Sequence, residues 1–109
     1  MHFLPKKFSP KRPLRHRITS VAVDSIWIRV QFEDGRTVEL PCSLYPRLLN
    51  ATEEERNRWR LIGSGAGIHW PNLDEDISAE NILERKPSLE GDGSFRRWLA
   101  QRAVPKRTA

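Results

Sequence analysis

A chain of 109 residues that is 30% charged and 38% hydrophobic has the length of one domain at most and the composition of a soluble globular protein. It has no apolar run near the roughly 18 residues of a membrane span, and its N-terminus has no apolar signal core, so we expect a cytoplasmic protein without membrane association. Cys42 is the only cysteine, which excludes an internal disulfide and makes a thiolate metal site a poor prediction.

The net charge of +5 is distributed unevenly. Residues 1–17 carry six Lys or Arg and no acid, for a charge of +6. Residues 18–83 carry six Arg and eleven acids, for −5, and residues 84–109 carry seven Lys or Arg and three acids, for +4. We therefore expect a disordered basic arm at 1–17, an acidic domain at 18–83, a linker at 84–93, and a basic amphipathic helix and tail at 94–109.

Residues 18–41 predict a small antiparallel β-meander. Residues 18–23 form the first strand, in which Val21 and Val23 alternate with smaller residues. The next strand has two faces, a buried one with Ile26, Ile28, Val30 and Phe32 and an exposed one with Trp27, Arg29 and Gln31. Asp34-Gly35 predicts a hairpin, and the return strand through Val38 and Leu40 ends at Pro41.

Short helices are predicted after this meander. Ser43 is the expected N-cap of the first, with Leu44, Leu48 and Leu49 facing the sheet. Thr52 and Glu55 form a capping box that opens a second helix, which we expect to run past Arg58, to be held by Trp59 and Ile62, and to end at Gly63.

Two further helices are predicted nearer the C-terminus. The first begins at Ser78 and is anchored by Ile82 and Leu83. The second is capped by Ser94, with Phe95, Trp98 and Leu99 on one face and arginines on the rest. The predicted fold class is therefore α+β: a small antiparallel meander with two to three short helices, flanked by basic arms.

Residues 63–78, GSGAGIHWPNLDEDIS, resemble several functional motifs without matching one. The spacing of Gly63, Gly65 and Gly67 fits neither a dinucleotide fingerprint nor a P-loop, and it precedes a predicted strand at 68–70 rather than a helix. Asp74, Asp76 and Ser78 alternate as in a calcium loop, but the sixth position is Ala79 instead of glycine. These features predict no calcium or phosphate site.

His69 and the acids of this stretch have structural interpretations. His69 has no second ligand at metal spacing, and a nucleophile built from Cys42, His69 and an aspartate lacks any local signature. We expect Trp70-Pro71 to plug the core and end the strand. The acids at 74–76 are expected to lie at the entry of the helix that starts at Ser78. No catalytic residue, metal or cofactor is predicted.

Four segments together resemble the bacterial family of domain of unknown function 2442. They are ITSVAV at 18–23, FEDGRTVELP at 32–41, PRLLNATEEERNRW at 46–59 and GIHWPNLDEDISAENIL at 67–83, so the resemblance runs from about Ile18 to Leu83. It implies a small α+β domain with the signature residues Gly67, His69, Trp70, Pro71 and Ser78. It also implies a non-enzymatic role, because such proteins are often encoded beside another small protein and are proposed to act like antitoxins.

Two functions are open at this point. In the first, the acidic domain binds a small protein partner, a toxin in the antitoxin interpretation; the candidate residues are Asp74, Glu75, Asp76, Phe95, Trp98 and Leu99. A partner or a second copy of the chain would also add burial to so small a domain. The simpler alternative is an acidic surface that only maintains solubility.

The second possible function is nucleic-acid binding. The basic ends would bind DNA or RNA phosphates without sequence specificity, with Phe3 and Phe8 available for stacking on bases. The candidate residues are Lys6, Lys7, Lys11, Arg12, Arg15, Arg17, Arg96, Arg97 and Arg102. The simpler alternative is a solvated basic tail.

Overall fold

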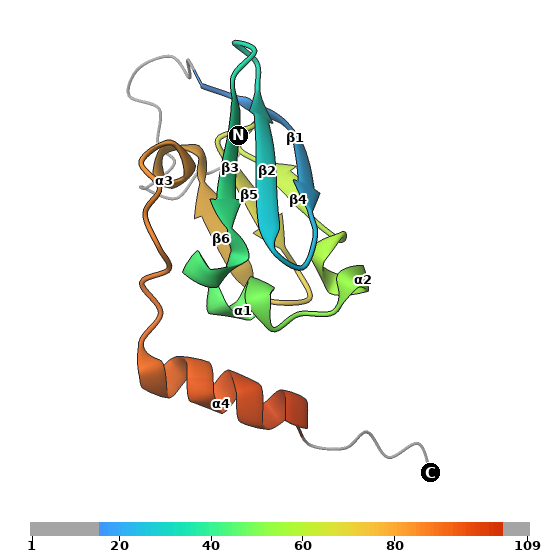
Figure 1. The fold of residues 1–109 in the computed structure, drawn as a ribbon, viewed down its shortest axis with the longest axis vertical. Helices are drawn as coiled ribbons and strands as arrows, with labels where there is room; N and C mark the ends of the chain where they lie inside the picture. Colours follow the sequence, from blue (N-terminus) through green and yellow to red (C-terminus); the bar gives the residue numbers. More distant parts are fainter. Residues whose placement is uncertain (1–15, 104–109) are drawn as a thin grey trace.

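Two three-stranded antiparallel sheets pack face to face around one core in the computed structural model, which describes residues 16–103 (Figure 1). The first sheet has the order β1 (Ile18–Val23), β2 (Trp27–Phe32), β3 (Thr37–Pro41). The second has the order β4 (Arg60–Ile62), β5 (Gly67–Trp70), β6 (Glu75–Ser78). With the short helices described below, this confirms the predicted α+β fold class.

The first sheet is the predicted meander. Ile28, Val30 and Phe32 are buried, as the alternation of β2 predicted. The prediction for Ile26 is wrong, since its side chain is 59% exposed. Ile26 lies in the β1–β2 turn, where Asp24 Oδ1 accepts the backbone N–H groups of Ile26 at 2.8 Å and Trp27 at 2.7 Å. Because of this turn, β2 begins at Trp27, one residue later than alternation alone suggests.

The second predicted helix is much shorter than expected. The capping box between Thr52 and Glu55 is present, but α2 spans only Glu53–Arg56. The Asn57 side chain then donates to the Glu53 carbonyl, a local bond that competes with helix continuation. Residues 60–62 form β4 instead, and Gly63 lies in the β4–β5 turn with a φ of 59°, not at a helix end.

The acids at 74–76 do not lead into a helix, which corrects another prediction. Glu75 and Asp76 belong to strand β6, and helix α3 (Ala79–Leu83) begins only after it. Ser78 caps α3 as predicted, since its side chain accepts the Asn81 backbone N–H at 3.1 Å. Ile82 of α3 is fully buried.

The first helix starts later than predicted. Residues Cys42–Leu44 form a 3-10 turn, and α1 spans Pro46–Leu49. Ser43 is therefore not its cap; Pro46 suits the first helical position because that position needs no N–H donor. Leu48 is buried as predicted, but Leu49 points outward and is 43% exposed.

One tryptophan joins the second sheet to α2. Trp70 is fully buried, and its indole N–H donates to the Arg56 carbonyl at 3.0 Å. The predicted core plug is thus confirmed. Around it, the buried residues of both sheets form one core with Tyr45, Leu48, Leu73 and Ile82.

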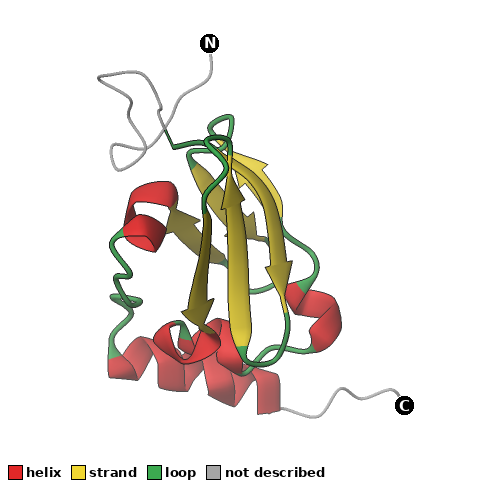
Figure 2. Cartoon of the chain, turned by 45° about the horizontal axis from the view of Figure 1, so that its top comes forward, coloured by secondary structure: helices red, strands yellow, loops and turns green. Residues whose placement is uncertain are grey.

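The last helix, α4 (Asp92–Ala103), begins two residues before the predicted cap Ser94. It lies across the end of the sandwich near α1, after an extended connection from α3 (Figures 1 and 2). No helix within residues 16–103 is long and apolar enough to cross a membrane.

Candidate functional site

The outer face of the first sheet is uncovered by any helix within residues 16–103 (Figures 1 and 2). Alternate residues of β2 point away from the core on this face, namely Trp27, Arg29 and Gln31, as predicted. Trp27 is 44% exposed, and Ile26 beside it is 59% exposed. Two adjacent large hydrophobic side chains therefore face solvent at the start of a regular strand.

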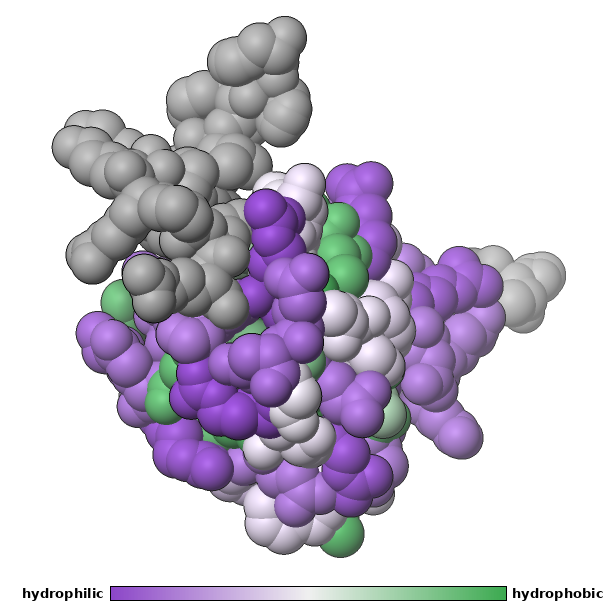
Figure 3. All heavy atoms as spheres, turned by 90° about the horizontal axis from the view of Figure 1, so that it is seen from above, coloured by the Kyte–Doolittle hydropathy of each residue, from purple (hydrophilic) through white to green (hydrophobic). Residues whose placement is uncertain are grey.

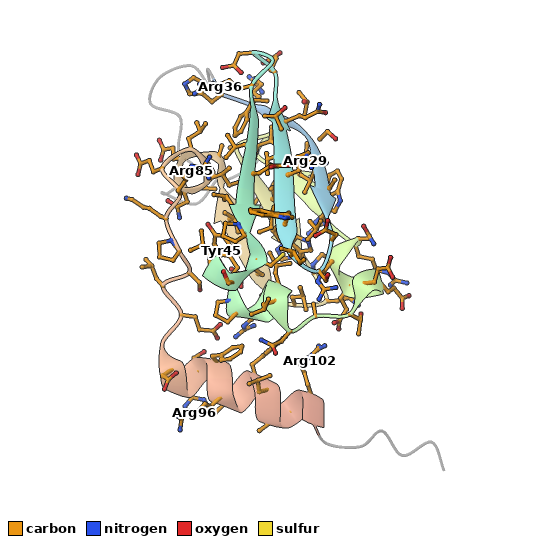
Figure 4. All side chains as sticks on the ribbon, viewed as in Figure 1. Arg29, Arg36, Tyr45, Arg85, Arg96 and Arg102 are labelled. Carbon is orange, nitrogen blue, oxygen red and sulfur yellow. The ribbon has the colours of Figure 1, made fainter. Side chains whose placement is uncertain are left out.

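The polar neighbours of Trp27 are held in fixed positions. Arg29 on β2 lies opposite Glu39 on β3, with its Nε donating at 2.7 Å and its Nη2 2.5 Å from Glu39 Oε2. Arg85, at the end of α3, donates to the Glu39 backbone carbonyl at 2.7 Å (Figure 4). We define the Trp27 face as Ile26, Trp27, Arg29 and Glu39.

The β1–β2 turn fixes one end of this face. Asp24 accepts two backbone N–H groups, and these bonds, first that from Trp27, lower the pKa of its carboxyl group. The side chain is therefore ionised at neutral pH and keeps the Trp27 backbone in place.

Figure 3 views the molecule from the end opposite α4. The surface of the described residues is mostly hydrophilic there, with small, separate hydrophobic patches.

Residues 63–78 form the β4–β5 turn and the strands β5 and β6 of the second sheet. Gly63, Ser64 and Gly65 all have positive φ, at 59°, 57° and 98°, and form the β4–β5 turn. His69 on β5 lies opposite Asp76 on β6, and their side chains are hydrogen-bonded through Nδ1 and Oδ1. Within the described residues, no group of three or more His, Cys, Asp or Glu is arranged to hold a metal ion.

Cys42 is separate from this histidine pair. Its thiol is buried and donates to the Asp24 backbone carbonyl at 3.4 Å. Burial raises the pKa of the thiol, which keeps it protonated. Cys42 is thus hydrogen-bonded to Asp24, whereas His69 is hydrogen-bonded to Asp76, and the two side chains do not form a Cys–His hydrogen bond.

The helix α4 is attached to the domain through one tryptophan and two arginines. Trp98 packs against the core, and its ring lies 5.3 Å from the Arg47 guanidinium and 4.5 Å from that of Arg102. Arg47 is paired with Glu90 at 2.6 Å, and Arg102 with Glu55 at 2.8 Å. In Figure 4, Arg102 points from α4 toward the domain and Arg96 points away.

These ion pairs change the titration of their carboxylates. The hydrogen bonds from Arg102 lower the pKa of Glu55 to about 2. Those from Arg47 also lower the pKa of Glu90. Both carboxylates are therefore negatively charged at neutral pH. Each of the two contacts is thus an ion pair between a charged carboxylate and a charged arginine.

The sequence-predicted nucleic-acid residues have different surroundings. Five of them, Lys6, Lys7, Lys11, Arg12 and Arg15, lie outside the described residues. Arg17 donates to the Ser64 carbonyl at 2.9 Å and lies 3.7 Å from Glu33. On α4, Arg96 and Arg97 are exposed, whereas Arg102 is bound to Glu55.

The predicted partner-binding residues are also divided. Asp74 and Asp76 are exposed, and Glu75 is half-buried. Phe95, Trp98 and Leu99 are half-buried, and Phe95 stacks on Trp98 with ring centroids 5.8 Å apart. The apolar side of α4 is thus partly covered by the domain.

Two features were missed in the sequence. The exposure of Ile26 follows from Asp24-Ser25, a turn signal that alternation in β2 obscured. The pairs of Arg47 with Glu90 and of Arg102 with Glu55 join residues more than forty positions apart. No local spacing could indicate them.

Comparison with known proteins places the chain in a family. Residues 18–88 match the family model described as protein of unknown function (DUF2442), so the chain belongs to this family. It is similar to a protein of unknown function from Rhodospirillum rubrum, with 26% identity and a TM-score of 0.62 over 70% of this chain and 94% of the other.

An uncharacterized protein from Chromobacterium violaceum, solved by NMR, shares the fold. It is 22% identical, with a TM-score of 0.57 over 83% of this chain and 79% of the other. No curated protein matches the chain. The comparisons thus establish the family and the fold of this chain.

Proposed function

We propose that this chain is a non-enzymatic, antitoxin-like protein of the cytoplasm that binds a small protein partner through the Trp27 face. The exposure of Ile26 and Trp27 beside the fixed Arg29–Glu39 pair is the observation that carries this proposal. Tryptophan and arginine are the residues that most often dominate binding energy at protein interfaces. A rigid sheet also loses little conformational freedom when a partner docks.

The acidity of the domain is a weaker basis for partner recognition than the Trp27 face. Several of its acids are already paired within the chain: Asp34 with Arg36, Glu39 with Arg29, Glu54 with Arg58, Glu55 with Arg102 and Asp76 with His69. Their charge is partly compensated before any partner arrives. We therefore assign recognition to the apolar centre of the Trp27 face and only orientation to the remaining acids.

The proposal gives no catalytic role to Cys42, His69 or Asp76. Cys42 is buried against a backbone carbonyl, and the side chains of His69 and Asp76 bond to each other. Each group has a structural use in the fold.

The test compares three tagged full-length baits in nuclease-treated host lysate: the natural chain, the double variant I26S/W27T and the control L89S. Leu89 is 94% exposed and lies outside the Trp27 face, so L89S removes exposed apolar surface elsewhere. We expect one small protein to be retained by the natural chain and by L89S and lost with I26S/W27T. Equal retention by all three baits would rule out the Trp27 face.

Nucleic-acid binding is the second candidate function. The exposed pair Arg96 and Arg97 on α4 supports it, because these cations add to the basic segments at both ends of the chain. Binding of this kind would survive I26S/W27T and be lost at high salt, which separates it from the first proposal.

A further inference from the structure

Helix α4 lies outside the residues that match the family model. The family match ends at residue 88, and α4 begins at Asp92. Its inward side chains Ser94, Phe95, Trp98, Leu99 and Arg102 are half-buried, in contrast to the fully buried core of the two sheets. The helix thus lies on a surface that the family domain itself provides.

The domain side of this contact is formed by α1 and α2. Arg47 of α1 lies over the Trp98 ring, and Glu55 of α2 binds both terminal nitrogens of Arg102. The Asn50 carbonyl accepts a further bond from Arg102 at 3.3 Å. Trp98 and Arg102 are four residues apart and lie on the same side of α4. The surface therefore recognises an aromatic side chain followed, one helical turn later, by an arginine.

Each of the two charged groups of the domain also makes one bond that does not involve α4. Glu55 Oε1 accepts the Thr52 backbone N–H at 2.9 Å within the capping box of α2. Arg47 donates from Nη1 to the Leu73 carbonyl at 2.8 Å. Arg47 is also held by Glu90, which lies in the connection before α4. We expect these bonds to keep the surface formed when α4 leaves, which is the condition for binding another helix in its place.

We propose that this surface is a helix-binding site, that α4 occupies it within the chain, and that an amphipathic helix of a partner protein displaces α4. The partner helix presents an aromatic residue and an arginine four positions later. Residues 86, 88 and 90 of the connection are bonded to Tyr45, Leu44 and Arg47 of the domain, so the exchange would take place about Gly91, which has open space around it. The site is independent of the Trp27 face, so either proposal can fail alone.

The experiment measures binding of a fluorescein-labelled peptide with the natural sequence 88–103 to the full-length chain. The variants W98A/R102A and, separately, R102E release α4 without changing the domain surface. We expect both to bind the peptide at least about 100-fold more tightly than the natural chain, in which the tethered helix competes at a high effective concentration. R102E keeps the apolar side of α4 and serves if the double variant does not fold.

Two controls identify the site. Adding E55Q to R102E removes the carboxylate that takes the peptide arginine, and should weaken peptide binding about tenfold or more. A peptide carrying W98A should fail to bind R102E. Retained binding in either control would place the peptide elsewhere and overturn the proposal.

Three further outcomes would also overturn it. Failure of the peptide to saturate the released variants at any accessible concentration would mean that the surface binds no helix in trans. The natural chain and R102E would bind the peptide equally if α4 did not occupy the site. A natural chain that is dimeric by sedimentation, and monomeric as R102E, would make a second copy the occupant instead of a partner protein.

Discussion

Arg56 is a charged side chain buried among backbone groups. Its Nε donates to the Leu48 carbonyl at 3.0 Å and its Nη2 to the Leu49 carbonyl at 3.3 Å, which satisfies the end of α1. We predict that Arg56→Met lowers the free energy of unfolding by about 2 kcal/mol, because carbonyl groups lose their donors without gaining water. Urea unfolding followed by tryptophan fluorescence measures the loss.

Arg58 provides the matched control. It is exposed and pairs with Glu54 at 2.8 Å across one helical turn. Arg58→Met should cost less than about 0.5 kcal/mol, since surface pairs of this kind contribute little. Similar losses for the two variants would mean that the bonds from Arg56 to the α1 carbonyls contribute no more than an exposed ion pair.

Gly65 meets the start of β1 too closely for any side chain. Its φ is +98°, and a Cβ atom there would lie 2.8 Å from the Ile18 backbone oxygen. Gly35 has nearly the same φ, +95°, with nothing within 4 Å. We predict a loss of about 3 kcal/mol or more for Gly65→Ala and about 1 to 2 kcal/mol for Gly35→Ala. Thermal unfolding of both variants separates the cost of the steric contact from the cost of the backbone strain, because only Gly65 has a close neighbour. Equal losses of stability in the two variants would show that the contact with Ile18 costs nothing.

At the scale of elements, the attachment of α4 makes stability depend on pH. The pKa of Glu55 is about 2 in the folded chain against an ordinary value of 4.5. A lowered folded pKa stabilises the protein above the ordinary value, and this stabilisation is lost as pH falls toward the folded pKa. We predict that Glu55→Gln is less stable than the natural chain at neutral pH and that the difference disappears by about pH 2.

The measurement is the urea midpoint of both chains across this pH range, with Glu54→Gln as the control. Glu54 is exposed, so its removal should change the midpoint little at any pH. A stability difference for Glu55→Gln that persists unchanged at about pH 2 would show that the glutamate carboxylate does not act through its charge.

The sequence predicts some elements well and others poorly, for physical reasons. The meander was predictable because alternation, Asp34-Gly35 and Pro41 are local signals that agree with one another. The second sheet was not, since β4 and β6 have only 3 and 4 residues and form by pairing with β5. The capping box at Thr52 correctly marks where α2 begins, but nothing in it limits α2 to one turn.

Of the two candidate surfaces, one could be predicted from the sequence and the other could not. The position of Trp27 on the outer face of β2 follows from strand periodicity alone. The docking of α4 depends on Glu55 and Arg47, which come from other elements, and so required the folded chain. A local pattern thus indicates which side chains point outward, and tertiary structure decides which of them remain free.

At the scale of the whole molecule, the positive charge at the C-terminal end is not equally available to a partner. Arg102 is paired with Glu55 against the domain, whereas Arg96 and Arg97 are exposed, Arg96 in a solvent-facing pair with Asp92 at 3.4 Å. If duplex DNA binds through α4 and the basic ends, each exposed arginine that contacts a phosphate releases counterions. Removing two such contacts should make the log-log salt dependence of binding shallower by about 1.8.

We therefore predict that R96Q/R97Q reduces the salt slope by this amount, measured by fluorescence anisotropy with a short labelled DNA duplex. The control R58Q/R60Q also removes two exposed arginines, Arg58 from the segment between α2 and β4 and Arg60 from β4. It lowers the net charge equally and should leave the slope nearly unchanged. Equal changes in the two variants would show that binding follows net charge and not α4. No measurable binding by the natural chain at low salt would leave protein recognition as the function that the exposed tryptophan supports.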